Sequence, residues 1–114
     1  MAPDRAELLQ GTLELLLLQI LSVAPEHGWG ITQRLEQVSG GALLVNQGSL
    51  YPALERLERK GWIRNEWQTT ENNRRARYYL LTPRGRRCLA VERAIWERSS
   101  RAVNSILAWA GETA

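Results

Sequence analysis

The apolar residues between Asn46 and Ile63 recur at the interval of an α-helical turn. Those at positions i, i+3, i+4 and i+7 form one stripe that a helix can bury: Leu50, Ala53, Leu54 and Leu57. The polar residues of the same stretch lie off that stripe and are predicted to stay available to solvent or to a partner: Gln47, Ser49, Tyr51, Glu55, Arg56, Arg59 and Lys60. The pattern fits an ordinary amphipathic surface helix, and it also fits a helix that enters the major groove of DNA.

The bounds of this helix follow from its capping residues. Either Asn46 or Ser49 can begin it, since both side chains accept a hydrogen bond from a free backbone N–H. Pro52 favours Ser49, because a proline is harmless only in the first turn, where its missing N–H would have no partner. Gly61 ends the helix, and Lys60 before it suits the negative end of the helix dipole.

A leucine-rich stretch predicts a first helix that begins at Leu8 or Thr12 and ends at Val23. Its main apolar stripe is Leu13, Leu16, Leu17, Ile20 and Leu21, with Leu15 and Leu18 to the side. A helix that is hydrophobic around most of its girth must be buried on more than one side. In so small a domain a second subunit is the simplest cover. The run is interrupted by Glu14 and Gln19 and is too short to cross a membrane.

A second helix is predicted over 29–38, after a turn at 25–28. Its inward residues are Ile31, Leu35 and Val38, and Gly40–Gly41 close it. Together with the helix that follows Asn46, it forms a helix-turn-helix arrangement.

The periodicity changes after Gly61. Residues 62–67 and 77–81 are rich in aromatic and branched residues, which favour β-strands. The polar stretch between them contains Thr69–Thr70 and Asn72–Asn73, which are typical of turns. These features predict a β-hairpin with a basic tip.

Thr82 and Pro83 then begin a last helix as its N-cap and first residue, and the helix is predicted to run to about Ala110. Its apolar stripe is Leu89, Ile95, Trp96, Ala102, Val103, Ile106, Leu107 and Trp109. A long terminal helix with such a seam most often pairs with another chain. The element order predicts a mainly α fold with a small β-hairpin, a winged helix-turn-helix at 1–81 followed by a C-terminal dimerisation helix at 82–114.

Composition adds a basic surface and excludes several classes of chemistry. The chain has 114 residues and a net charge of +3, yet six arginines and no acid lie between Arg74 and Arg87. Such a run suits phosphate, although a solvated arginine face is the commoner reason for it. No carboxylate pair, catalytic triad or glycine-rich phosphate loop is evident, so we expect no enzymatic activity and no cofactor. The single Cys88 and the single His27 cannot form a tetrahedral zinc site or an internal disulfide, and we expect a cytoplasmic protein.

The predicted helix and the arginine hairpin together form a composite candidate site for double-stranded DNA. The helix would reach base edges or phosphates in the major groove through Gln47, Ser49 and Tyr51. The hairpin would contact phosphate or a narrow minor groove through Arg74, Arg75 and Arg77. The alternative is a winged helix used for protein interaction, in which the apolar last helix binds a different partner.

The remaining chemistry-bearing residues have ordinary structural roles available to them. We expect His27 to cap or pack at a helix start, and Cys88 to be a buried small hydrophobe rather than a thiolate favoured by Arg86 and Arg87. The tryptophans 62, 67, 96 and 109 suit a core or an interface. In a dimer, however, Trp96, Val103 and Trp109 could also line a pocket in which a planar aromatic effector stacks.

Four motifs resemble the PadR family of bacterial transcriptional regulators. They are GTLELLLLQIL at 11–21, HGWGI at 27–31, GSLYPALERLERKGWI at 48–63 and RYYLLTPRGR at 77–86. The resemblance implies a homodimeric repressor whose winged helices bind an inverted-repeat operator, with the last helix crossing to the first helix of the partner. It assigns DNA contacts to Ser49 and Tyr51 on the recognition helix and to Arg74, Arg75 and Arg77 on the hairpin.

Two positions depart from the family pattern. Trp29 stands where the family usually has tyrosine, so a phosphate contact by that hydroxyl is replaced at most by an indole N–H, and Gly30 stands where a polar residue is usual. The chain also ends soon after one terminal helix, as in the short-tailed branch of the family. In some members of that branch planar aromatic compounds bind between the terminal helices, and Trp96 matches an aromatic residue of that kind.

Overall fold

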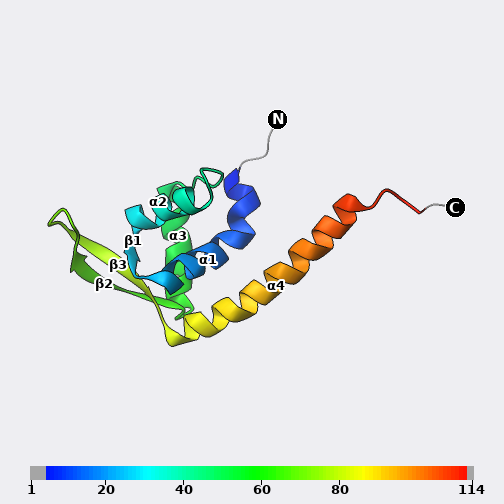
Figure 1. Cartoon of the computed structure of the whole chain (residues 1–114). Coiled ribbons are helices and arrows are strands. Elements are labelled where there is room, and N and C mark those ends of the chain that lie inside the picture. The colour runs from blue at the N-terminus through cyan, green and yellow to red at the C-terminus, as the bar shows by residue number, and fades with distance from the viewer. Residues whose placement is uncertain (1–4, 113–114) are drawn as a thin grey trace.

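The computed structural model describes residues 5–112, with side chains from residue 12 onward. Its elements are, in order, α1 (Arg5–Val23), β1 (Glu26–His27), α2 (Gly28–Val38), α3 (Gln47–Arg59), β2 (Ile63–Thr69), β3 (Arg75–Leu81) and α4 (Pro83–Ala108). In Figure 1 the first three helices form a bundle, the β2–β3 hairpin extends from one side of it, and α4 runs away from it. The molecule is accordingly elongated, with extents of 67 × 33 × 21 Å.

The hydrophobic core lies where α1, α2 and α3 meet the base of the hairpin. Its completely buried large side chains are Leu17, Leu18, Ile31, Leu50, Leu54 and Leu57. The stripe predicted on α3 is therefore confirmed. On α1 the prediction was partly wrong, because Leu18 is in the core whereas Leu16 and Ile20 are only half-buried. The cause is that α1 contacts elements on several sides, so its buried surface is wider than one stripe. The helix also begins before Leu8, at Arg5, in a run of good helix formers.

The start of α3 corrects the predicted cap. The N-cap is Asn46, whose Oδ1 accepts a hydrogen bond of 2.9 Å from the backbone N–H of Ser49. Pro52 lies inside the helix, one turn further than the preference for Ser49 assumed. The proline ring is exposed, and the helix lacks the one hydrogen bond that a backbone N–H at position 52 would donate to the carbonyl of residue 48. At the other end Gly61 has a φ of 76°, which confirms the predicted termination.

The predicted turn at 25–28 is instead a two-residue strand, β1, followed directly by α2. In this sheet β1 pairs with β3, so the hairpin is part of a three-stranded antiparallel sheet with the order β1-β3-β2. His27 caps α2, as expected, by accepting a 3.0 Å hydrogen bond at Nδ1 from the N–H of Gly30. Val38 was predicted to face inward but is 75% exposed. It is the last residue of α2, beyond the part of the helix that packs on the core.

The hairpin itself is confirmed, with Ile63 opposite Leu81 at its base and Thr69 opposite Arg75 next to its tip. The turn is closed by a hydrogen bond of 2.9 Å from Asn73 N–H to the carbonyl of Thr70. Asn73 adopts a φ of 60°, a conformation that asparagine tolerates better than most residues.

The last helix begins at the predicted cap and is anchored only at its start. The Thr82 hydroxyl accepts a 3.0 Å hydrogen bond from the N–H of Gly85 and donates to the carbonyl of Gly61 at 2.8 Å. Gly85 is packed so closely that an added β-carbon would overlap the carbonyl oxygen of Trp62. Leu89 is the last core residue along α4, and the apolar side chains beyond it are exposed.

Candidate nucleic-acid interface

The first turns of α3 present the predicted polar residues at the surface. Gln47 is exposed, Ser49 is half-buried and Tyr51 is 44% exposed. Ser49 is not the cap, so its hydroxyl is not used to begin the helix. The side chain of Tyr51 is less free than its position off the apolar stripe predicts. A β-carbon at Gly28 would lie 2.5 Å from its phenolic oxygen, so the ring packs against the start of α2.

The start of α2 is shaped by β1. The carboxylate of Glu26 accepts a 3.2 Å hydrogen bond from the N–H of His27, and it lies where a side chain at Gly30 would have to go. A side chain at position 30 would therefore have to displace the carboxylate of Glu26. Trp29, the other departure, is mostly exposed at the outer side of the helix.

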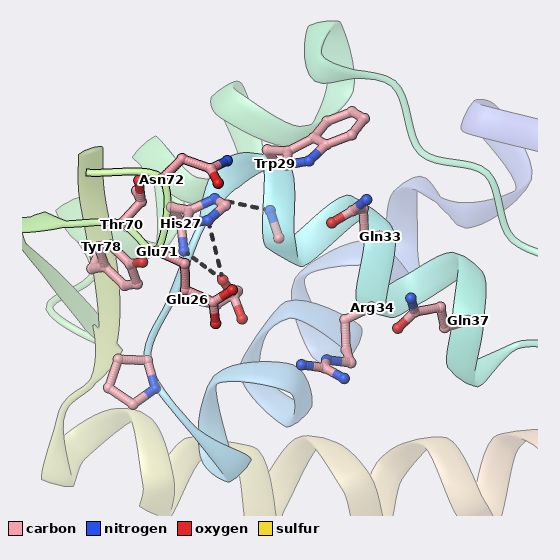
Figure 2. Close-up of a pocket in the computed structure, with 12 residues that line it drawn as sticks. Glu26, His27, Trp29, Gln33, Arg34, Gln37, Thr70, Glu71, Asn72 and Tyr78 are labelled. Atoms are coloured by element: carbon pink, nitrogen blue, oxygen red, sulfur yellow. Dashed lines mark hydrogen bonds and ion pairs between the residues drawn. The ribbon is translucent and has the colours of Figure 1, made fainter. Parts of the chain in front are cut away.

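A polar cavity of about 500 Å³ lies between the start of α2 and the hairpin turn. Figure 2 shows α2 contributing Gln33, Arg34 and Gln37 on one side, and the turn contributing Thr70 and Asn72 on the other. His27 is between them, with its ring edge-on to Tyr78 at a centroid distance of 5.2 Å. The cavity separates the tip of the hairpin from α2, whereas the base of the hairpin is held by the core.

One face of the hairpin carries a cluster that sequence reasoning did not identify. The Cζ atoms of Arg75 and Arg77 lie 5.5 and 5.0 Å from the ring centroid of Trp67. All three side chains are on the same face, since Trp67 is opposite Arg77 and Thr69 is opposite Arg75. Trp67 had been assigned to a core or interface, yet it is 54% exposed. The alternation of side chains along β2 could have indicated this position. It places Trp67 on the same face as the buried Ile63, but four residues closer to the hairpin turn.

The base of this face contacts α3. Asn65 donates a side-chain hydrogen bond to the carboxylate of Glu58, and Tyr79, opposite Asn65, is buried. Burial, then the nearby Glu58 carboxylate and Tyr51, raise the pKa of Tyr79 above its ordinary value. The arginine-bearing face of the hairpin is thus a continuation of the face that packs on α3.

The other basic residues near α3 are already paired. Glu14 on α1 binds Arg56 at 2.8 Å and Lys60 at 2.9 Å, and Arg64 on the opposite face of the hairpin binds Glu66 at 3.1 Å. Arg56 and Lys60 therefore stabilise the contact between α1 and α3 instead of being free, as their position off the apolar stripe had suggested. Lys60 also lies over the ring of Trp62, 4.6 Å from its centroid.

The run of arginines between Arg74 and Arg87 does not form one patch. Arg74 is at the hairpin turn and Arg75 and Arg77 are on β3, whereas Arg84, Arg86 and Arg87 are in the first turns of α4. The hairpin lies between the two groups, because α4 begins at the base of β3 and the turn is at the opposite end. The first group is on the part of the hairpin next to the turn, whereas Arg84 of the second group lies beside Gly61, after the end of α3.

The residues predicted for a dimer interface or effector pocket are all exposed, on α4 or directly after it. Trp96 and Val103 are seven residues apart, hence on one side of the helix, and are 48% and 56% exposed. Trp109 follows the helix as its C-cap residue. Cys88, near the start of α4, is half-buried beside Trp62 and Val91 in a shallow apolar groove. Among the residues described, no helix has the length and apolar character needed to cross a membrane.

Three helices, a helix-turn-helix at α2–α3 and a β-hairpin with an arginine-bearing face together define a winged helix-turn-helix protein of the DNA-binding class. Residues 17–91 match the model of the transcriptional regulator PadR-like family. The chain belongs to that family, and its general function is DNA-binding regulation of transcription. The fold predicted from sequence is confirmed.

Two relatives illustrate the similarity in sequence. The chain is 39% identical over 77 residues to a transcriptional regulator of Mycobacterium tuberculosis, an alignment that covers 68% of each protein. It is 43% identical over 79 residues to an uncharacterized 37.1 kDa protein in a transposon of Streptomyces fradiae, covering 69% of this chain but only 21% of that protein. The chain thus spans about a fifth of the length of the latter relative.

Solved structures are similar over nearly the whole chain. A PadR-like transcriptional regulator from Bacillus cereus superimposes with a TM-score of 0.77 at 27% identity, covering 93% of this chain and 99% of that one. A PadR-like transcription factor from Bacteroides fragilis gives a TM-score of 0.71 at 29% identity, covering 90% and 96%. The similarity includes the long terminal helix, since residues 17–91 alone would be a smaller share of the chain.

Proposed function

We propose that the protein is a homodimeric transcriptional repressor that binds an inverted-repeat operator through two winged helices and acts in the cytoplasm. The observation that carries the proposal is the exposed apolar side of α4, which includes Trp96, Val103 and Ile106. A single chain leaves this side uncovered, and large exposed apolar patches mark interaction sites. A second α4 offers a matching surface, and a twofold interface is the commonest way to cover it.

In this dimer each α3 enters a major groove. Gln47, Ser49 and Tyr51 contact base edges or adjacent phosphates from the first turns of the helix, and Arg74, Arg75 and Arg77 contact phosphate or a narrow minor groove from the hairpin, hereafter the wing. Support comes from the exposure of Gln47 and Tyr51 and from the arginine-bearing face that continues from α3. The two half-sites would be about one turn of DNA apart.

Release by a small effector is the second part of the proposal. Between two α4 helices, Trp96 of each chain, with Val103 and Trp109, would line a pocket for a planar aromatic molecule. The half-exposed indole of Trp96 on the side that would face the partner supports this role. An effector that binds there would change the distance between the wings and weaken the fit to both half-sites.

Two measurements test the proposal together. Size-exclusion chromatography with light scattering should give twice the 13.0 kDa mass of one chain. Val103→Asp should give a monomer, whereas Ala94→Asp, the same change of charge at an exposed position on the opposite side of α4, should not. Gel shifts should show nanomolar binding to DNA from upstream of the gene, weakening steeply with salt. A monomer that binds all DNA equally weakly would instead favour a winged helix whose α4 binds a different protein.

Substitutions distinguish contacts to bases from contacts to phosphates, because the two kinds of contact affect sequence preference and salt dependence differently. Ser49→Ala or Tyr51→Ala should change the preferred sequence, at about 1–3 kcal/mol for each interaction with a base that is removed. Arg74→Ala should weaken binding to all sequences alike and flatten the salt dependence. Quenching of tryptophan fluorescence by flat aromatic compounds, absent in Trp96→Ala, tests the effector pocket; equal quenching in both would contradict it.

A further inference from the structure

We propose that Trp67 is a positioning residue for DNA binding: its indole holds Arg75 and Arg77 in the orientation in which they contact the DNA backbone. This inference rests on the proposed function of the wing and adds a residue to which neither the family pattern nor the predicted site gave a role.

The first step is the distance between the arginines and the indole. Both guanidinium groups lie within about 6 Å of the same indole centroid, the range in which a cation is attracted to the ring. Arg77 is the direct cross-strand partner of Trp67, and Arg75 is the next residue along β3 on the same face. The hairpin register therefore brings the three side chains together without help from any other element.

The second step is the charge that remains on the arginines. Among the described lysines and arginines, the ion pairs engage Arg56, Arg59, Lys60 and Arg64, whereas Arg75 and Arg77 have no carboxylate within ion-pair distance. Arg64 is a useful contrast, because it is on the same hairpin but on the opposite face and is paired with Glu66. Of the three wing arginines that are in no ion pair among the described residues, Arg75 and Arg77 contact the indole, whereas Arg74 is at the turn.

The third step is what an indole does for an arginine. A free arginine loses rotamer entropy when its side chain is fixed, and a contact that fixes it beforehand lowers this cost on binding. Stacking on a ring uses the face of the guanidinium and leaves its N–H groups, which lie in the plane, free to bind phosphate oxygens. An indole thus orients the arginine without competing for its donors, whereas a carboxylate would occupy them.

The fourth step is the small role of Trp67 in folding. The side chain is more than half exposed and is outside the core cluster, which ends along this face at Ile63 and Tyr79. Its contribution to stability is accordingly small, so its replacement is expected to affect binding much more than folding. A residue that served only the core would show the opposite behaviour.

The test is a double-mutant cycle on binding to a fluorescently labelled duplex from upstream of the gene. Trp67→Leu should weaken binding about 5- to 20-fold, because two cation–π interactions that orient the arginines are removed. In the Arg75→Gln, Arg77→Gln background the same change should have less than about a twofold effect, because no arginine is present to be positioned. Trp67→Phe keeps an aromatic face and should retain most of the binding.

Salt dependence gives a second readout. Arg75→Gln with Arg77→Gln should lower the slope of log K against log salt by about 2, since two arginine–phosphate pairs are removed, whereas Trp67→Leu should leave the slope nearly unchanged. Arg64→Gln, the control on the other face, should change neither affinity nor slope. Melting temperatures of all variants should stay close to that of the parent.

Different failures have different meanings. An equal loss of affinity from Trp67→Leu in both backgrounds, or no loss in the parent, overturns the positioning role. If the parent binds DNA without sequence selectivity, the proposed operator recognition fails, while the same cycle on that DNA at low salt still decides the role of Trp67. A parent that binds no DNA at all overturns both.

Discussion

The ring of Tyr51 on α3 lies against the backbone of Gly28, the first residue of α2, with no room between them for a β-carbon. The contact joins the two helices of the helix-turn-helix at their N-terminal ends. It orients the ring at the surface, and for the DNA contact proposed for Tyr51 such an orientation before binding would lower the entropy cost.

Gly28→Ala should therefore displace Tyr51 and weaken specific DNA binding by about 1 kcal/mol or more, an amount typical of removing one interaction with a base or phosphate. Folding stability should fall less than binding, because the added methyl meets the far end of a side chain that can turn away. In a Tyr51→Ala background Gly28→Ala should have no further effect on affinity, as measured by fluorescence anisotropy. An additional decrease there would mean that position 28 acts independently of the ring.

Glu14 joins α1 to two cations of α3, and this pairing makes stability depend on pH. Partial burial tends to raise the pKa of Glu14, but the hydrogen bonds and charges of Arg56 and Lys60 outweigh it, so the folded pKa is lowered. The stabilisation is fully present above the ordinary carboxyl pKa of about 4.3 and is lost as the pH falls through the lowered folded value.

Glu14→Gln should accordingly cost about 1 kcal/mol at pH 7 in urea unfolding, with the difference from the parent shrinking below about pH 4. Glu55→Gln is the matched control, because its only ion pair among the described residues, with Arg59, is between exposed side chains. It should cost about 0.5 kcal/mol or less. A pH-independent difference for Glu14→Gln would show that packing, not charge, is responsible.

Gly85 allows α4 to approach the chain at Trp62. Gly85→Ala should destabilise the protein by about 2 kcal/mol or more, because the β-carbon would meet a carbonyl oxygen that belongs to the backbone and cannot rotate away. Arg86→Ala, on the exposed neighbouring position, is expected to stay within about 0.5 kcal/mol of the parent. Thermal unfolding monitored by circular dichroism measures the stability of the two variants. Equal stability of the two variants would contradict the close approach.

His27 caps α2 with an imidazole nitrogen, a role that asparagine fills at the start of α3. His27→Ala should cost about 1 kcal/mol of stability through the unsatisfied N–H of Gly30, whereas His27→Asn should recover most of it. Hydrogen exchange of the Gly30 amide should be faster in the alanine variant alone. If both variants are destabilised by the same amount, the contact with Tyr78 outweighs the cap.

The fold could be predicted largely because each helix has a pattern of its own. The stripe from Leu50 to Leu57, the glycine after α3 and the Thr82–Pro83 cap are local signals, and the structure confirms all of them. The predictions that were wrong concerned residues whose structure depends on contacts with residues distant in the sequence. Two residues at β1 carry no periodicity, and only their pairing with β3 makes them a strand.

The sequence did not predict the start of α3 or the hairpin cluster, and the reasons differ. The proline rule favoured Ser49, but the helix is capped by Asn46 and accommodates Pro52 in its second turn. Trp67 was assigned by residue type to a core or interface, whereas its environment is set by the register of two strands. The DNA contacts predicted for residues from Gln47 to Arg77 stay predictions until binding is measured.

Beyond Leu89 the apolar residues of α4 are exposed, so a small rotation at the start of the helix moves its far end over a larger distance. From Ala90 to Ala108 the helix is about 28 Å long at 1.5 Å per residue, so a rotation of about 10° at its anchored end displaces the other end by about 5 Å. The anchored end consists of the Thr82 cap, the glycine pressed against Trp62, and Leu89 in the core. In the proposed dimer that corner would be the hinge, and its stiffness would set how much variation in half-site spacing one molecule accepts.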